Sequence, residues 1–109
     1  MTVTVERDDN IKIIAMDGQL DVSSSDKARE EVINLLDGKP TIISLEKVSY
    51  VSSSGLRTLL MIAKTAKARK IKIIYAAAID EVVDVLQMTG FIKMLRCVKT
   101  VDDAIAELS

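Results

Sequence analysis

Alternating and apolar runs along the chain predict five short strands. Valine alternates with polar residues in TVTVE at residues 2–6, and the run IKIIAM at 11–16 follows the polar stretch RDDN. Two such runs joined by a short polar connection are typical of a β-hairpin. We expect Gly18 and the serines that follow to end the second strand. Three further runs predict strands, the last of them short: TIISLEKV at 41–48, IKIIYAA at 71–77 and LRCVK at 95–99.

Apolar residues at helical spacing predict four helices between and after these strands. We expect the first to stop at the segment DGKP, because Gly38 can adopt the left-handed conformation and Pro40 blocks continuation. The second ends in KTAKARK, which places cations where a helix C-terminus favours them. The four apolar faces comprise Ala28, Val32, Leu35 and Leu36; Leu56, Leu59, Leu60, Ala63 and Ala66; Ile79, Val82, Val83 and Leu86; and Val101, Ala104, Ile105 and Leu108.

The resulting order of elements, β-β-α-β-α-β-α-(β)-α, indicates an α/β fold. Strands that alternate with helices form a largely parallel sheet, to which the N-terminal hairpin adds an antiparallel strand. The chain has 109 residues, of which 49% are hydrophobic, and this suffices to build one core. We therefore expect a single α/β domain over residues 1–109, with a mixed central sheet packed with about four α-helices.

Composition and charge narrow the range of partners and compartments. A formal net charge of −1 argues against a nucleic-acid partner, which normally requires a basic face. The one cysteine, Cys97, cannot form an internal disulfide and suits a reducing cytosol. The N-terminus lacks the pattern of a secretory signal, and no apolar run approaches the ~20 residues that span a membrane. We expect a cytoplasmic protein with no membrane partner, and a monomer because no heptad pattern appears.

Three serines and a glycine stand where a strand gives way to a helix, in VSYVSSSGLRTLL at 48–60. Serine is a good helix N-cap, and the same interpretation covers Ser23, Ser24 and Ser25 before the first helix. The other three helices, however, have carboxylates in their first turn, whereas this one has none and contains Arg57. Because a helix N-terminus favours negative charge, the segment resembles an open anion site that contains hydroxyls. Phosphorylation of a serine would fill such a site, and Gly55 would allow a close approach to the backbone.

Enzymatic chemistry is poorly supported by the residues present. Without histidine the chain cannot form a Ser-His-Asp triad, and a transition-metal site is not expected. The segment SSSG is neither a hydrolase nucleophile elbow nor part of a phosphate-binding Walker loop. We therefore expect a protein that is not an enzyme and has neither a catalytic residue nor a metal site.

At these residues the sequence resembles the STAS family, the domain of bacterial anti-sigma factor antagonists. Three segments carry the resemblance in order: DGQLDVSSSDKAREEV, VSYVSSSGLRTLL and MTGFIKML. When Gly55 is aligned with the family glycine, Ser53 falls on the phosphorylated serine, with Ser52 as the second choice. Ser52 and Ser44 stand where members commonly have aspartate, while Asp21 matches a family acidic residue. The partner contacts that the resemblance implies are Asp21, Ser23, Ser52, Ser53, Ser54, Gly55, Leu56 and Arg57.

The spacing of one of these contacts, Leu56, also fits a core position.

The family further implies a partner-switching mechanism. The unmodified domain would bind an anti-sigma factor that is also a serine kinase, and so release a sigma factor for transcription. Phosphorylation of Ser53 would break this complex, and a serine phosphatase would reset it. The resemblance implies no cofactor, since ATP enters only as the co-substrate of the kinase.

Two other functions remain open at this point. Serine in place of aspartate at Ser44 and Ser52 suits a constitutive STAS scaffold in a signalling or transport assembly. Alternatively, the helix start near Ser54 could bind a small anion or a nucleotide. A serine-dependent enzyme is the least favoured interpretation.

Overall fold

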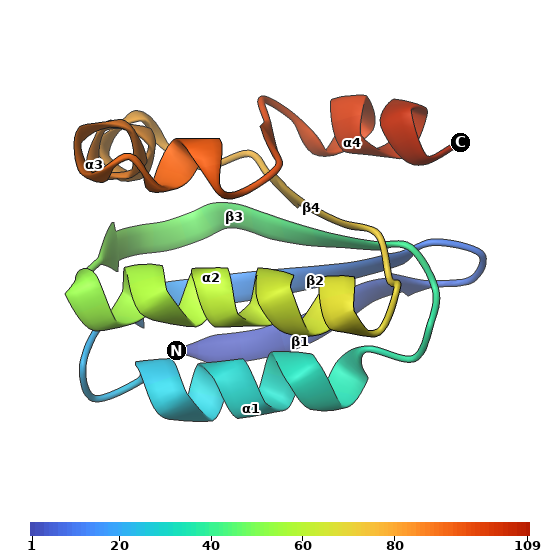
Figure 1. The fold of residues 1–109 in the computed structure, drawn as a ribbon, viewed down its shortest axis with the longest axis horizontal. Helices are drawn as coiled ribbons and strands as arrows, with labels where there is room; N and C mark the ends of the chain where they lie inside the picture. The colour runs from blue at the N-terminus through green and yellow to red at the C-terminus, as the bar shows by residue number, and fades with distance from the viewer.

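Five strands form one mixed sheet in the computed structural model, which describes residues 1–109 (Figure 1). Their order across the sheet is β1-β2-β3-β4-β5. Strand β1 pairs antiparallel with β2, and every later pair is parallel, so the predicted hairpin and parallel core are both confirmed. The strands are β1 (Thr2–Asp8), β2 (Lys12–Leu20), β3 (Thr41–Val51), β4 (Ile73–Ala76) and β5 (Cys97–Val98).

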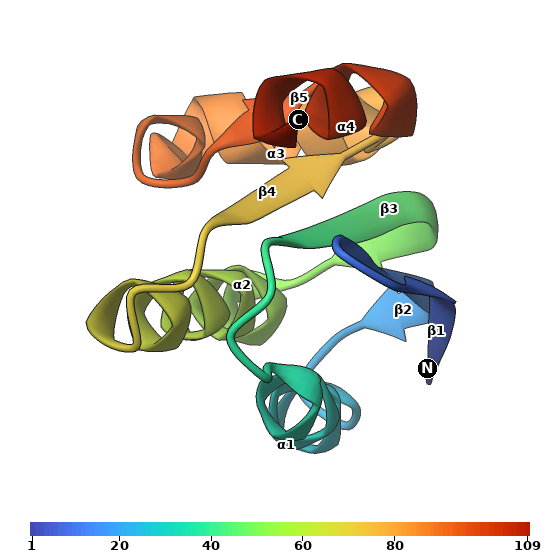
Figure 2. The ribbon, with the colours of Figure 1, turned by 90° about the vertical axis from the view of Figure 1, so that its right-hand side faces the viewer.

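The four predicted helices are present, together with a short 3₁₀ helix. Helices α1 and α2 lie together on one side of the sheet and α4 lies on the other (Figures 1 and 2). None of the helices combines the length and the apolar composition needed to cross a bilayer. The helices are α1 (Ser25–Leu35), α2 (Ser53–Ala68), α3 (Asp80–Thr89) and α4 (Val101–Leu108), and the 3₁₀ helix η1 spans Phe91–Lys93.

Alternate residues along the strands build two separate hydrophobic clusters. On β3, Ile43 joins a large cluster with side chains of α1, α2 and α3, whereas its neighbour Ile42 joins a smaller one with Ala104 of α4. The one buried aromatic residue, Tyr75, lies in the large cluster and donates a hydrogen bond of 2.7 Å from its hydroxyl to the carbonyl of Leu59 in α2. The period of two along each strand thus assigns residues to two faces.

The second strand is longer than expected and continues through Gly18 to Leu20. Its pairing with β3 shifts register between Ala15 and Asp17 and again between Gly18 and Gln19. Gly18 has a φ of +123°, a conformation that glycine adopts without strain. The glycine therefore bends the strand at an irregularity instead of ending it.

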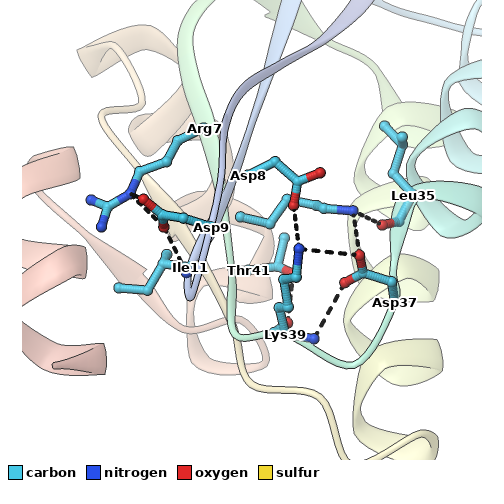
Figure 3. A network of polar contacts seen from close by, with 9 residues as sticks. Arg7, Asp8, Asp9, Ile11, Leu35, Asp37, Lys39 and Thr41 are labelled. Atoms are coloured by element: carbon cyan, nitrogen blue, oxygen red, sulfur yellow. Dashed lines mark hydrogen bonds and ion pairs between the residues drawn. The ribbon is translucent and has the colours of Figure 1, made fainter.

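The end of α1 also differs from the expectation. The helix stops at Leu35, and Gly38, with a φ of +99°, lies beyond the helix end instead of capping it. The Lys12 ammonium, which is almost fully buried, donates to the carbonyl of Leu35 at 2.7 Å and to the Asp37 carboxylate at 2.9 Å. Lys39 joins the same network through Asp37 and through Asp8 of β1 (Figure 3). A cation from β2 therefore satisfies the C-terminal end of α1.

Candidate functional site

The carboxyl ends of β2 and β3 bring two loops together at one edge of the sheet. Leu20 pairs with Val51, and the Ser52 amide donates to the Leu20 carbonyl at 2.9 Å. The β2–α1 loop therefore lies beside the start of α2. This edge, where parallel strands end, is the usual position of a binding site in open α/β sheets.

The three serines at the start of α2 occupy three different environments. Ser52 is the N-cap, with its hydroxyl oxygen accepting from the Gly55 amide at 3.2 Å and its carbonyl from the Leu56 amide at 2.8 Å. Ser53, the first residue of the helix, is exposed, whereas Ser52 and Ser54 are half-buried. The capping interpretation is thus confirmed for Ser52, and Ser53 is the serine whose hydroxyl an outside protein can reach.

The first turn of α2, which contains Ser53, has backbone donors without partners. The backbone amides of Ser53 and Ser54 have no acceptor within the protein. No acidic residue stands in the first turn of α2, whereas α1, α3 and α4 each have at least one there. Arg57, one turn further along, is exposed. A negative group at this helix start would meet free amides, the helix dipole and a cation.

Gly55 has a different role from the one expected. A β-carbon on Gly55 would overlap the carbonyl oxygen of Leu20 and lie 2.9 Å from Cγ1 of Val51. The close approach that this glycine allows is therefore that of the protein's own β2, and the expectation that it opens the backbone to an outside group is wrong. Leu56 is only 5% exposed and packs in the large cluster, as its helical spacing indicated.

Asp21 organises the β2–α1 loop. One of its carboxylate oxygens accepts from the Ser23 hydroxyl at 2.7 Å and from the amides of Ser23 and Ser24 at 3.0 and 3.2 Å. The hydrogen bond from the Ser23 hydroxyl is the main cause of a lowered pKa of Asp21. The expectation that serines cap α1 is wrong, because the Ser24 hydroxyl makes no capping bond and instead donates to the carbonyl of Gln19 at 2.7 Å. The Ser25 hydroxyl donates to the Asp21 carbonyl.

Two residues near this edge were not predicted from the sequence to belong to the site. Val22, at the tip of the loop between Asp21 and Ser23, is 81% exposed, although it is apolar. The buried Thr58 hydroxyl donates to the Ser25 carbonyl at 3.2 Å and so joins α2 to the start of α1. The only sequence signal for Val22 was an apolar residue within a polar loop.

Cys97 and the acidic residues do not gather into a group that could bind a metal ion. No group of three or more cysteine, aspartate or glutamate side chains lies close enough together to hold a metal ion. Cys97 lines an apolar pocket of about 260 Å³ together with Leu45, Val83 and Leu86. Burial raises the pKa of the Cys97 thiol, which makes it a weaker nucleophile at neutral pH.

The comparisons with known proteins agree with the fold. The STAS domain family matches residues 2–104. BtrV of Bordetella bronchiseptica strain RB50, whose name marks it as a candidate anti-sigma factor antagonist, is 22% identical over 96 residues, which cover 86% of this chain and 83% of that protein.

Two solved structures extend the comparison. The unphosphorylated form of the anti-sigma factor antagonist SpoIIAA has a TM-score of 0.76 and 21% identity, covering 97% of this chain and 95% of its own. The murine anion transporter Slc26a9 contains a similar region, with a TM-score of 0.80 and 19% identity, covering 91% of this chain and 18% of the transporter. At these identities both likenesses concern the fold.

Proposed function

This chain belongs to the STAS domain family, and we propose that it is an anti-sigma factor antagonist whose binding is controlled by phosphorylation of Ser53. The observation that carries the proposal is the exposed Ser53 hydroxyl at a helix start with free amides and no carboxylate. The name of BtrV and the unphosphorylated state specified for SpoIIAA support the same function. The partner is an anti-sigma factor with serine kinase activity.

Ser53 is a better phosphate acceptor than Ser52 for a geometric reason. The Ser52 hydroxyl is half-buried and already accepts the Gly55 amide, so a phosphoryl group there would disturb the helix cap. The Ser53 hydroxyl makes no hydrogen bond within the protein and faces solvent. Modification at Ser53 therefore leaves the local fold intact.

The phosphoryl group would act mainly on the partner. It brings about −1.5 to −2 charges and three acceptor oxygens, which the Ser53 and Ser54 amides can receive. An acidic or apolar protein surface docked on the loop around Val22 and on Arg57 would not tolerate this group and would be displaced. The switch thus changes binding and leaves the fold unchanged.

In this cycle the domain is a substrate and a regulator. The kinase transfers the γ-phosphoryl group of ATP to the Ser53 oxygen, and ADP and the hydroxyl proton leave. A serine phosphatase then hydrolyses the ester with one water molecule and returns the free hydroxyl and inorganic phosphate. Binding of the unmodified domain occupies the anti-sigma factor and releases the sigma factor.

Intact-mass spectrometry after incubation with ATP and an anti-sigma kinase encoded near this gene tests the proposal. We expect the mass of one phosphoryl group on the wild type and on Ser54→Ala, and none on Ser53→Ala. In size-exclusion binding assays, Ser53→Ala should keep the kinase complex and Ser53→Asp should lose it. An unchanged wild-type mass with a kinase of verified activity would refute the proposal.

Two alternatives make different predictions in the same assays. A constitutive scaffold is suggested by the similarity to the transporter and by serine in place of aspartate at positions 44 and 52. Its Ser53→Ala and Ser53→Asp variants would bind the partner with equal affinity. A small-anion or nucleotide site near Ser54 would show micromolar binding of phosphate or nucleotide in calorimetry.

A further inference from the structure

The charges of this protein are strongly segregated along the chain. Between Glu46 and Asp80 there are seven basic residues and no acidic one. That segment carries +7 and the remaining residues −8, which together give the net charge of −1. Most of these cations gather at the C-terminal end of α2, which lies about 24 Å along the helix axis from Ser53.

Three of these cations, together with Arg96, line one shallow groove of about 400 Å³ between the end of α2 and the chain that enters β5. Its apolar surface comes from Ala63, Ile71, Ile73 and Met94, and its cations are Lys67, Lys70, Lys72 and Arg96. Arg96 is paired with Glu107 of α4, whereas the three lysines make no ion pair. The charge of Lys72 is partly offset by Glu107, so the positive charge beside the apolar surface of the groove is carried mainly by Lys67 and Lys70.

Lys70 occupies a position where its residue type is unfavourable. It follows the C-cap of α2 with a φ of +59°, and the bonds from Lys70 N to Lys67 O and from Ile71 N to Ala66 O form a Schellman motif. Glycine is the usual residue at this place because it adopts positive φ without strain. The fold alone would be served at least as well by glycine, and the lysine at this position adds a cation to the groove.

An open strand edge runs through the same region. Strand β4 pairs with β5 only at Tyr75 and Ala76, and the Tyr75 amide donates to the carbonyl of Arg96 at 2.9 Å. Ile74 is buried, so the part of β4 that is open on that side is Ile73, at the start of the strand. A second groove of about 250 Å³, bordered by Glu107 and Leu108 of α4, lies along this edge as well. The two grooves share Lys72, Ile73 and Arg96. An extended backbone laid against Ile73 would have one groove on each side.

We infer that this surface, the α2–β4 groove, binds a short extended acidic segment of a partner protein, which adds to the free edge of β4. Its carboxylates would meet Lys67, Lys70 and Lys72, and its alternate apolar side chains would rest on Met94 and Ile71. No aromatic residue lines the groove to stack a nucleic-acid base, which argues against single-stranded nucleic acid. An open strand edge suits a peptide better than a lipid surface. This surface lies apart from Ser53, so binding there continues whether or not Ser53 is modified.

Fluorescence anisotropy with a labelled peptide of alternating glutamate and valine tests this inference, at an ionic strength of about 0.05 M to limit screening. We expect saturable binding, weakened at least about tenfold by the double charge reversal Lys67→Glu with Lys72→Glu. The matched control is Lys27→Glu with Lys47→Glu, two exposed lysines outside the groove with the same change of net charge. Equal weakening by both pairs, or no binding to the wild type, would overturn the proposal.

Two further measurements separate the contribution of Lys70 from that of the strand edge. Lys70→Gly should weaken binding severalfold without lowering the melting temperature, a combination that a purely structural role for Lys70 would not produce. The same peptide with alternate backbone amides N-methylated keeps its charge but cannot extend the sheet, and it should bind much more weakly. Unchanged affinity of the methylated peptide, or tighter binding of a single-stranded oligonucleotide or of phosphatidylglycerol vesicles, would refute the assignment to an extended acidic segment.

Discussion

Replacing Lys12 by methionine tests how the C-terminal end of α1 is held. The Lys12 ammonium donates to the Leu35 carbonyl at 2.7 Å and to the Asp37 carboxylate at 2.9 Å, and its side chain is only 6% exposed. Methionine fills nearly the same volume, so the change removes two charge-assisted hydrogen bonds without creating a large cavity.

The size of the loss in stability depends on how far Asp37 and the Leu35 carbonyl can regain hydrogen bonds to water. Removing one partner of a fully buried ion pair costs about 3–5 kcal/mol, but Asp37 is 43% exposed and regains hydration. The Leu35 carbonyl loses a cation at a helix C-terminus and a charged hydrogen bond, which together are worth about 2 kcal/mol. We therefore expect a loss of about 2 kcal/mol in the free energy of unfolding, or a fall of roughly 8–12 °C in Tm.

Urea unfolding followed by circular dichroism measures this loss, with Lys39→Met as the control. Lys39 is exposed enough for its ion pairs with Asp8 and Asp37 to be screened, so its replacement should cost much less.

The hydrogen bond from Lys12 is also the main cause of the lowered pKa of Asp37. A lowered pKa stabilises the fold above the unfolded value, near 3.8, and this contribution disappears as the pH falls through the folded value. The gap between wild type and Lys12→Met should therefore narrow below pH 3.8. Equal midpoints for wild type and Lys12→Met at pH 7, or equal losses for both variants, would refute this account.

Three further predictions concern the helix start and the core. Gly55→Ala should lower the free energy of unfolding by about 2 kcal/mol or more, because the new methyl group overlaps the Leu20 carbonyl. This loss should occur despite the better helix propensity of alanine. Thermal melts measure it, and an unchanged Tm would contradict the packing role of Gly55. Ser52→Ala should cost about 1 kcal/mol through loss of the cap, whereas Ser53→Ala should leave urea unfolding unchanged, and the reverse order would disprove the assignment of the cap. Burial raises the pKa of Tyr75 well above 10.0, so the unfolded state releases this proton first and stability should fall as the pH rises above 10.0. This fall should be clearly smaller in Tyr75→Phe, which loses about 1 kcal/mol at neutral pH with its bond to Leu59. A fall of the same size in Tyr75→Phe would rule out Tyr75 as its source.

The sequence alone determined which elements form and in what order. The alternation of Val3 and Val5, the mostly apolar run 41–48 and the helical spacing of Val82 and Leu86 all indicate local burial, which depends on period and composition. The missing carboxylate in the first turn of α2 was equally visible, because helix electrostatics follow from residues adjacent in the chain. The match to the STAS domain family over residues 2–104 agrees with the predicted order of strands and helices.

Tertiary structure decided what each polar residue contacts. The residue that packs closest to Gly55 is Leu20 of β2, and the cation at the end of α1 comes from Lys12. Arg96 lines the same groove as Lys67 of α2 only because β4 and α3 fold between them. Ser52 and Ser53 are identical in the sequence, yet one caps the helix and the other faces solvent, since the direction of α2 is set by its packing on Leu20. Such contacts join residues distant in the chain, and their geometry depends on how whole elements pack, so no local pattern encodes them.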